Sequence, residues 1–580
     1  MLLPILIYSI PAILVYVLIR NYLLLPNTIP GPFLARFTNL YRLLLVSLRS
    51  PHEHHLRLHR QFGPVVRLGP NNVSVSGSSK YVTQIYGIGK GFVKSDFYSC
   101  FQNVVNGRRA ASLVAMTDET EHAKSKRLIA HAYSLSILVE YEELVDRTIQ
   151  VFLATLQERF CLPEPASPTS STCTRLSSPT LDLCQYLQFF AFDVIGELTF
   201  SHRLGFIESG TDVDGIMAAI GANFEYFSVL GQMPWLDEAI LGKNPIYVRY
   251  FRNPVSSPIL RFAQRLLRQR LAEVDSEKSD GTPKTSKSDT QVSNLSSSVS
   301  LNRPDFLSRF LKIQHEQSIP SSANPSSDDN SEALMSDSTI LSNLFMNINA
   351  GSDTIASTLR AIFYHLLKNP SSLEALRAEL DAAADASTIT TPCPTWAQTQ
   401  NHLPYLCATV KEGLRLNPAL SLPLERVVPS GGLTLVHDEE DMDTSPQVPP
   451  TATSTPQAPP PTKYQSTYLP PGTIVGINPW VHHRHTTRTF GHDADTWNPN
   501  RWLTNEEKST KKMEHAMLAF GAGKRSCLGK NIALLELHKV VAALVLRFDI
   551  ELVSQDKDWT VRNAWALSQT GIDVRIRRRQ

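Results

Sequence analysis

One cysteine near the C-terminal end of the chain stands in a loop that suits a metal-binding thiolate. Residues 520–529 read FGAGKRSCLG, and an expected apolar helix at 532–545 follows at once. A helix N-terminus and free backbone N–H groups stabilise a thiolate. Gly523 and Gly529 permit tight turns and close approach of the backbone to a flat cofactor. We expect Cys527 to bind that cofactor, Phe520 to shield the sulfur from water, and Arg525 to meet an anionic cofactor group.

The spacing of this loop decides between cofactors. A phosphate-binding loop needs Gly where Leu518 stands and Ser or Thr where Arg525 stands, so it is excluded. A cysteine in an ordinary buried turn is the plain alternative. The stretch resembles the haem-binding pattern F-x-x-G-x-R-x-C-x-G of the cytochrome P450 family at every defined position. The resemblance implies haem b with Cys527 as the axial iron ligand, a thiolate that favours O–O bond cleavage.

A polar group interrupts a long helix expected at 338–369, whose apolar residues fall on one face. It reads Ala350-Gly-Ser-Asp353-Thr354, and Pro370 ends the helix. Ser, Thr and Asp compete for backbone hydrogen bonds, and such local violations tend to mark functional sites. A kink or a solvated face is the alternative reading. The segment resembles the oxygen-activating groove of the family, which implies that Thr354 hydrogen-bonds bound dioxygen and that Asp353 relays protons from solvent.

Two further motifs agree with the resemblance by their order along the chain. Glu412 and Arg415 share one face of a helix at i,i+3 spacing, and Pro499-Asn-Arg501-Trp resembles a later element of the family. The resemblance implies that Glu412, Arg415 and Arg501 form a buried charge triad behind the haem. Taken alone, an E-x-x-R pair is usually a solvated surface pair.

The two haem propionates need cations or hydrogen-bond donors. In the stretch that resembles the family's W-x-x-x-R motif, His122 replaces the tryptophan and Lys126 replaces the arginine. Arg426 is a further position implied by the resemblance, and each of these residues could instead be a surface cation. The expected cofactor-binding residues are Cys527, Phe520, Gly521, Arg525, Gly529, His122, Lys126 and Arg426.

Composition narrows the remaining function classes. The 580 residues carry 56 Lys+Arg against 54 Asp+Glu, and this balance argues against a nucleic-acid-binding protein. Seven scattered cysteines without a CxxC pair argue against a disulfide framework or a structural zinc site, and favour a reducing compartment. His482, His483 and His485 stand too close together to share one metal ion from a regular element.

The N-terminal stretch predicts membrane attachment. Residues 1–19 carry no charge, no positive segment precedes them and no cleavage site follows, so they read as a transmembrane anchor rather than a signal peptide or a buried helix. Positive charge begins at Arg20, which leaves the rest of the chain in the cytoplasm. We expect an anchor at 1–25, a proline-rich hinge at 26–36 and a catalytic domain at 37–580, on the endoplasmic reticulum as a single-pass protein.

The catalytic domain is expected to be mainly α, with small sheets around a buried haem. Helical spacing of apolar residues marks 180–200, 215–230 and 258–274, and short strands are expected at 65–68, 73–75, 473–477 and, more weakly, 546–552. Two polar, proline-rich stretches, about 276–330 and 437–467, read as surface insertions, the first of them around a short helix at 304–314.

The resemblance implies a monooxygenase that inserts one oxygen atom of dioxygen into a lipophilic small molecule. Within the family the chain resembles fungal microsomal members of the pisatin-demethylase-like group, a context of secondary metabolism, through IPGPFLAR at 29–36, FDVIGE at 192–197 and GQMPW at 231–235. Because 53 residues follow Cys527 (580 minus 527), a separate NADPH–cytochrome P450 reductase is expected. The expected substrate pocket joins segments 101–114, 224–233 and 420–424, Ala350, and a turn at 567–570. The alternatives are a haem-thiolate isomerase or dehydratase and a non-catalytic haem-binding sensor.

Overall fold

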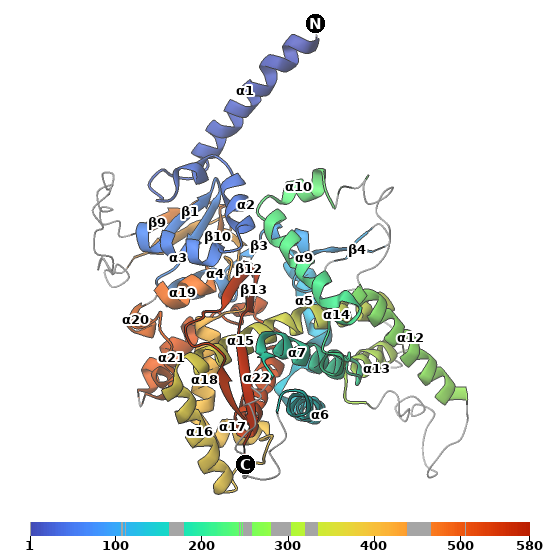
Figure 1. Ribbon diagram of the computed structural model, residues 1–580. Helices are drawn as coiled ribbons and strands as arrows, with labels where there is room; N and C mark the ends of the chain where they lie inside the picture. Colours follow the sequence, from blue (N-terminus) through green and yellow to red (C-terminus); the bar gives the residue numbers. More distant parts are fainter. Residues whose placement is uncertain are drawn as a thin grey trace.

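The computed structural model shows a mainly helical molecule with small sheets set among the helices (Figure 1). It describes residues 2–105, 108–110, 112–161, 179–242, 244, 246, 258–279, 303–318, 335–437, 466–485, 487–504 and 506–579. Among these residues the strands form five sheets, the largest with five strands. The predicted mainly α fold with small sheets is confirmed.

The largest sheet gathers strands from both ends of the chain. Its order is β1-β2-β10-β7-β3, and β2 runs parallel to β10 while the other neighbours are antiparallel. One face carries a compact apolar cluster that includes Val73, Val475 and Leu518. The bounds are β1 (Val65–Gly69), β2 (Asn72–Val75), β3 (Val93–Lys94), β7 (Arg426–Val427) and β10 (Ile474–Gly476).

The main core lies among long helices at the centre of the molecule (Figure 1). They are α6 (Leu135–Phe160), α7 (Leu183–Phe200), α15 (Asp353–Lys368), α18 (Pro404–Leu416) and α22 (Lys530–Arg547). Sixteen of the eighteen residues of α7 are buried, and they lie on every face of the helix, as expected for a helix surrounded by protein. The helices predicted at 180–200 and 532–545 are confirmed as α7 and α22.

The single helix predicted at 338–369 is wrong, because the structure has two. α14 (Asp337–Gly351) ends and α15 begins on either side of Ser352, whose φ of −85° and ψ of −66° lie in the right-handed helical region but away from the mean helix values. The hydroxyl of Ser352 donates to the carbonyl of Ile348 at 2.7 Å, and that of Thr354 donates to the carbonyl of Ala350 at 2.7 Å. Bonds of this kind to carbonyls four residues back often bend helices, and the two residues that make them lie at the break.

The predicted strands and the other predicted helices are also found. The helices at 215–230 and 258–274 are α9 and a longer α12, and the weakly expected strand at 546–552 is β11 (Phe548–Leu552), paired with β14 (Asp573–Arg578). The remaining α-helices are α2 (Leu40–Ser47), α3 (Pro51–Phe62), α4 (Ser79–Tyr86), α5 (Glu119–Ile129), α8 (Phe206–Ser209), α9 (Ile216–Leu230), α10 (Pro234–Ala239), α12 (Pro258–Ser279), α13 (Phe306–Ser318), α16 (Pro370–Asp385), α17 (Trp396–His402), α19 (Pro479–His485), α20 (Thr487–Phe490) and α21 (Glu507–Ala516).

Short elements connect the long helices and carry part of the site. The 3-10 turns are η1 (Phe33–Arg36), η2 (Asp96–Phe101), η3 (Ala130–Tyr133), η4 (Val213–Gly215), η7 (Pro499–Leu503) and η8 (Gly523–Arg525). The smaller sheets use β4 (Asn103–Val105), β5 (Arg108–Ala110), β6 (Leu181–Asp182), β8 (Leu433–Val436), β9 (Ser466–Leu469), β12 (Thr560–Ala564) and β13 (Ala566–Thr570), together with β11 and β14.

Most of the two stretches interpreted as insertions, 280–302 with 319–334 and 438–465, lies outside the described residues. The short helix expected at 304–314 is present as α13, and its apolar side chains belong to the main core. Buried Asp305 accepts from the guanidinium of Arg270 on α12 at 3.1 Å. This helix is therefore part of the folded domain rather than of a surface insertion.

The N-terminal helix α1 (Leu2–Leu23) projects from the rest of the molecule (Figure 1). Within the described part of the chain, no helix combines the length and the apolar character that crossing a bilayer requires. The predicted transmembrane anchor is therefore not confirmed. The segment 26–36, predicted to be a hinge, packs on β1, where the Arg67 N–H donates to the Pro30 carbonyl at 2.7 Å.

Candidate functional site

The loop before α22 holds Cys527 by backbone bonds. The N–H of Cys527 donates to the carbonyl of Phe520 at 2.8 Å, which closes the loop on itself. Gly521 and Gly523 have φ of +66° and +64°, a conformation that favours glycine. A Cβ on Gly523 would lie 1.9 Å from the carbonyl oxygen of Tyr86, so the loop packs directly on the end of α4.

Gly529 does not form the tight turn that the sequence predicted for it. Its φ is −82°, so it makes no left-handed turn, and a Cβ there would meet no atom within 4 Å. Its backbone N–H instead faces the sulfur of Cys527. The open side of Gly529 and the solvent-accessible Cys527 thiol leave room for a flat group to approach the loop.

The thiol of Cys527 is surrounded by groups that act in opposite directions on its acidity. Although Cys527 is exposed on the surface of the loop, desolvation by the protein atoms packed around the sulfur raises the pKa of the thiol above the ordinary value. The Gly529 N–H and the charges of Lys126 and Lys530 lower that pKa, and the net shift is upward. Coordination to a metal ion removes the proton of a thiol outright. The donor set, one thiolate ligand with two nearby cations, therefore fits the iron of a haem.

Arg525, His122 and Lys126 come together beside this loop. The guanidinium of Arg525 is almost fully buried and pairs with Glu119 of α5 at 2.8 Å, and Lys524 pairs with the same carboxylate at 2.9 Å. The Lys126 ammonium donates to the carbonyl of Lys524 at 2.9 Å. Burial, followed by the charge of Arg525, lowers the pKa of His122 to about 4, so His122 is a neutral donor at physiological pH. Sequence reasoning missed Glu119.

Arg426 approaches the same region from β7. Its guanidinium lies over the ring of Tyr86, 5.0 Å from the centroid, and donates to the carbonyl of Glu425 at 2.8 Å. Arg426, Lys524 and Arg525 line one small hollow. The structure therefore brings together the four residues predicted to meet the propionates, and these donors fit a group with two carboxylates.

Asp353 and Thr354 lie at the junction of α14 and α15. The carboxylate of Asp353 accepts from the side-chain amide of Gln188 on α7 at 2.7 Å, and Gln188 in turn accepts from Arg360. Burial raises the pKa of Asp353 above its ordinary value, although Arg360 and Gln188 oppose the shift. A Cβ on Gly351 would lie 2.8 Å from Ile195, so this glycine allows α14 to approach α7.

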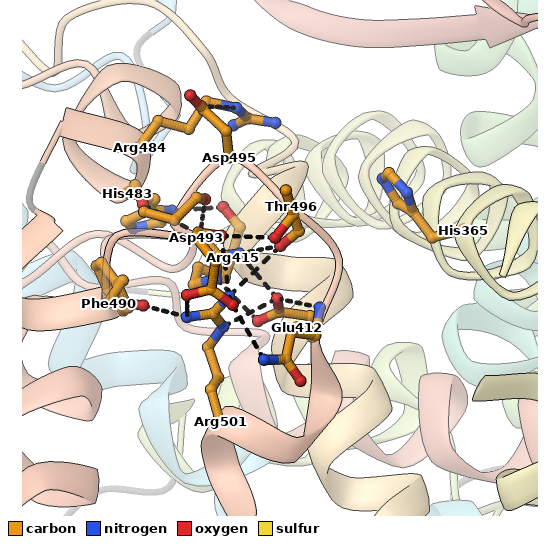
Figure 2. A network of polar contacts seen from close by, with 12 residues as sticks. His365, Glu412, Arg415, His483, Arg484, Phe490, Asp493, Asp495, Thr496 and Arg501 are labelled. Carbon is orange, nitrogen blue, oxygen red and sulfur yellow. Dashed lines mark hydrogen bonds and ion pairs between the residues drawn. The ribbon is translucent and has the colours of Figure 1, made fainter. Parts of the chain in front are cut away.

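Glu412, Arg415 and Arg501 meet in a buried network (Figure 2). Arg415 Nη2 lies 2.8 Å from Glu412 Oε1, and Arg501 Nε lies 3.0 Å from the same oxygen. Asp493, which sequence reasoning missed, pairs with Arg501 at 2.9 Å. Burial raises the pKa of Glu412, but the hydrogen bond and charge of Arg415 outweigh it, and the net pKa is lowered.

His483 ties this network to the cysteine loop. Its Nδ1 lies 2.8 Å from the carbonyl of Arg415, and its Nε2 accepts from the N–H of Leu518 at 2.8 Å. Leu518 in turn accepts from the N–H of Gly521 at 2.9 Å. The charge network therefore supports the loop that holds Cys527.

The segments expected to line a substrate pocket meet in an aromatic cluster. Phe101, Phe224 and Leu420 pack with Trp565, and the Phe101 and Trp565 ring centroids are 4.4 Å apart. The turn expected at 567–570 is wrong, because those residues belong to β13 and the turn falls at Trp565, with φ of +70°. A bulky residue with positive φ is rare and has no sequence signal.

Comparison with known proteins agrees with this geometry. A family model described as Cytochrome P450 matches residues 30–435 and 448–574. The chain belongs to the cytochrome P450 family. It is 40% identical over 549 residues to a cytochrome P450 monooxygenase of Aspergillus terreus, a match that covers 94% of this chain and 95% of the relative. Membership implies a thiolate-ligated haem.

Other relatives of this cytochrome P450 have the same enzyme class. The cytochrome P450 monooxygenase pkfB of Emericella nidulans is 37% identical over 551 residues, 95% of this chain and 91% of that protein. The cytochrome P450 monooxygenase mpaDE of Penicillium roqueforti is 36% identical over 552 residues, which is 95% of this chain but 55% of that longer protein. The chain is thus an enzyme of the cytochrome P450 monooxygenase class.

Proposed function

We propose that this cytochrome P450 inserts one oxygen atom of dioxygen into a lipophilic small molecule of fungal secondary metabolism. The observation that carries the proposal is that one chain has both the Cys527 loop and a polar break, Asp353 and Thr354, at the junction of two helices of the main core. The fungal source of the relatives supports the metabolic context. Within the family, we propose that the chain belongs to the pisatin-demethylase-like subgroup, which it resembles.

The bound haem supplies the redox chemistry that activates dioxygen. Cys527 would hold the iron, and its loop is kept in place by the carbonyl of Phe520 and by the contact of Gly523 with Tyr86. Thr354 offers a hydroxyl that can leave the Ala350 carbonyl and donate a hydrogen bond into the site. Asp353 holds or releases a proton beside it, because its raised pKa brings ionisation nearer to neutrality.

The proposed substrate is lipophilic because the segments around the expected pocket are aromatic. Phe224 and Phe101 both pack against Trp565, with ring centroids 5.9 Å and 4.4 Å from it. Ligand sites are lined mainly by hydrophobic and aromatic side chains, with few polar groups that fix orientation. This composition supports an apolar substrate and does not select one molecule.

We also propose a separate NADPH–cytochrome P450 reductase as electron donor, and attachment to the cytoplasmic side of the endoplasmic reticulum membrane. The support for attachment is the run of exposed apolar side chains on α1, where Leu23 is 69% exposed and Tyr16 67%. Exposed apolar surfaces of this kind mark protein or membrane contacts.

The test uses the full chain in membranes with added reductase, a lipophilic extract of fungal metabolites and isotopically labelled dioxygen. The proposal predicts products that carry one labelled oxygen atom and that form only when both NADPH and reductase are present. Product formation without NADPH and without the label would instead identify a haem-thiolate isomerase or dehydratase. A haem-binding sensor would give no product under either condition.

A further inference from the structure

Trp565 stands in the aromatic cluster where the segments of the expected pocket meet. It is 7% exposed and lies at the turn between β12 and β13. Within the described residues, its buried indole N–H has no hydrogen-bond partner. A buried indole N–H usually finds a partner, and leaving a buried donor unpaired costs free energy. The tip of this hairpin therefore holds a hydrogen-bond donor that the described chain leaves unused.

The backbone at Trp565 is held in a conformation that a bulky residue disfavours. Its φ is +70°, in the left-handed region. Two backbone bonds fix the turn, because the N–H of Ser421 donates to the Trp565 carbonyl at 3.2 Å and the N–H of Leu567 donates to the Ala419 carbonyl at 2.8 Å. Strained positions persist where their surroundings over-determine them, and they cluster at active sites and ligand clamps. The place of the indole is therefore set by the fold.

The described neighbours of the indole ring offer it no acceptor. The ring centroids of Phe101 and Phe224 lie 4.4 Å and 5.9 Å from that of Trp565, and Phe227 packs on Phe101 at 5.0 Å. Leu420 belongs to the same cluster. None of these four side chains can accept a hydrogen bond. An acceptor for the N–H must therefore come from a bound molecule.

The cluster brings together parts of the chain that are distant in sequence. Phe101 comes from η2, Phe224 and Phe227 come from α9, and Leu420 precedes β7. Ligand pockets are lined mainly by apolar and aromatic side chains, with a few polar groups that fix the orientation of the ligand. A single N–H donor among aromatic rings has the character of such a group.

We propose that the indole N–H of Trp565 donates a hydrogen bond to a carbonyl oxygen of the substrate. The enzyme then prefers lipophilic molecules that carry such an oxygen over hydrocarbons of the same shape. This inference rests on the proposed function and narrows its substrate class. A molecule without the oxygen leaves the buried N–H unpaired, and sites built to pair a polar group discriminate against ligands that lack its partner.

A second unpaired indole provides a matched control. The N–H of Trp497 is also buried without a partner among the described residues. Its ring stacks on that of His365, with centroids 5.0 Å apart, and does not belong to the aromatic cluster around Trp565. Trp497→Phe thus removes the same group from a place where no substrate is expected.

The test uses the haem-loaded, full-length protein and three ligand pairs in which a ketone replaces a methylene group: 9-fluorenone and fluorene, 1-indanone and indane, 1-tetralone and tetralin. Dissociation constants are measured for the wild type, Trp565→Phe and Trp497→Phe from the ligand-induced change in haem absorbance. The infrared band of bound 9-fluorenone reports on the carbonyl directly, because a hydrogen bond lowers its stretching frequency.

The proposal predicts that the wild type binds a ketone more tightly than its methylene counterpart, on the order of threefold to tenfold, the range for one neutral hydrogen bond. Trp565→Phe should remove this preference by weakening the ketone alone. The same variant should return the carbonyl band to the frequency found in an apolar solvent. Trp497→Phe should change neither the preference nor the band.

Three results would overturn the assignment. A wild type that prefers none of the ketones, including one that binds neither member of any pair, would do so without any variant having to fold. Equal weakening of ketone and methylene ligands in Trp565→Phe would show that the indole only fills space. A lowered carbonyl frequency that survives in Trp565→Phe would assign the bond to another donor. Failure of the proposed function is seen separately, as a missing thiolate-ligated haem spectrum or missing labelled product.

Discussion

The carboxylate of Asp353 turns toward α7, where it accepts from Gln188, while the hydroxyl of Thr354 bonds within its own helix. Asp353 and Thr354 are adjacent in the sequence, but their side chains bind different partners. Gln188 also contacts Arg360, so a chain of three side chains runs from the helix break toward the Cys184 carbonyl, to which Arg360 donates at 2.8 Å. At the scale of residues, these partners set how readily Asp353 exchanges a proton.

The first prediction concerns the acidity of Asp353. Its pKa is raised by burial and held back by Arg360 and by the Gln188 amide. Gln188→Leu removes a donor that favours the carboxylate, so the pKa rises further and the acid-side midpoint of the turnover rate moves to higher pH. The measurement is the pH profile of NADPH-dependent turnover. Gln185→Leu, an exposed position on the same helix, should leave the midpoint in place.

The second prediction separates the hydroxyl of Thr354 from its helix bond. Thr354→Ala should lower product formed per NADPH consumed by about 100-fold, the scale of a lost proton-transfer group. Thr358→Ala is the control, because Thr358 makes the same kind of bond, to the Thr354 carbonyl at 3.0 Å, one turn further along. Equal coupling in the two variants would remove Thr354 from the mechanism.

At the scale of residues, the sequence predicted the site residues that stand in recognisable motifs. It did not predict residues whose role depends on their contacts in the folded chain. Cys527, Arg525 and Asp353 stand in ordered motifs. Glu119 is an ordinary glutamate in the sequence, and only the approach of α5 to the cysteine loop gives it its partners, Lys524 and Arg525. Such partners are tertiary and leave no local pattern.

At the scale of elements, the charge network joins α18, η7 and the segment between α19 and η7 (Figure 2). Glu412 accepts from Arg415 and Arg501, from the indole of Trp502 at 2.9 Å and from the N–H of Asn498 at 2.9 Å. Four donors on one buried carboxylate explain its lowered pKa. Removal of the Glu412 charge would leave the buried guanidinium groups of Arg415 and Arg501 without this counter-charge.

The third prediction follows from the four hydrogen-bond donors that surround the Glu412 carboxylate. Glu412→Gln should cost about 3–5 kcal/mol of unfolding free energy, as for other broken buried ion pairs, measured by urea unfolding. The lowered pKa means that the wild type holds this stabilisation above the ordinary glutamate pKa of 4.5 and loses it as pH falls through the folded value. The stability of the variant should therefore depend less on acid pH.

A surface pair in the same region provides the control for Glu412. Glu514→Gln breaks the ion pair with Lys411, which is 2.6 Å long but exposed. Exposed pairs contribute about 0–1 kcal/mol, so this variant should unfold nearly as the wild type does. A similar, small loss in both variants would mean that the buried network does not brace the fold.

The elements themselves were largely predictable, but their breaks were not. The apolar spacing that marks α7, α9 and α22 repeats over many residues and identifies each helix. The same spacing runs unbroken through Ser352, so it predicted one helix where two are found. No sequence pattern marks the role of Gly351, where an added Cβ would lie 2.8 Å from Ile195, so packing against α7 requires a glycine there.

At the scale of the whole molecule, α1 projects from the domain with apolar side chains exposed, yet its end is anchored (Figure 1). The guanidinium of Arg67 donates to the carbonyl of Asn21 at 3.0 Å, and Leu25 is buried in the cluster on the main sheet. The boundary expected at residue 25 thus falls inside the folded part. Residues 2–19 are the segment that can be removed without touching these contacts.

The fourth prediction tests membrane attachment by that segment. Deletion of residues 2–19 should move the protein from the membrane pellet to the supernatant on centrifugation, because exposed apolar side chains of α1 are lost. The haem spectrum should not change, because Asn21 and Leu25 stay in place. A truncated protein that still pellets with intact membranes would place the attachment elsewhere.

The central claim is that Cys527 holds a haem as its thiolate ligand. The most direct measurement is a carbon monoxide difference spectrum of the reduced, membrane-expressed protein, with Cys527→Ala and Cys407→Ala beside it. The account predicts a strongly red-shifted Soret band in the wild type and in Cys407→Ala, whose thiol lies on α18 and contacts the Thr399 carbonyl. Cys527→Ala should lack that band. A band at the position of histidine-ligated haem, or a folded wild-type protein that binds no haem, would contradict the account.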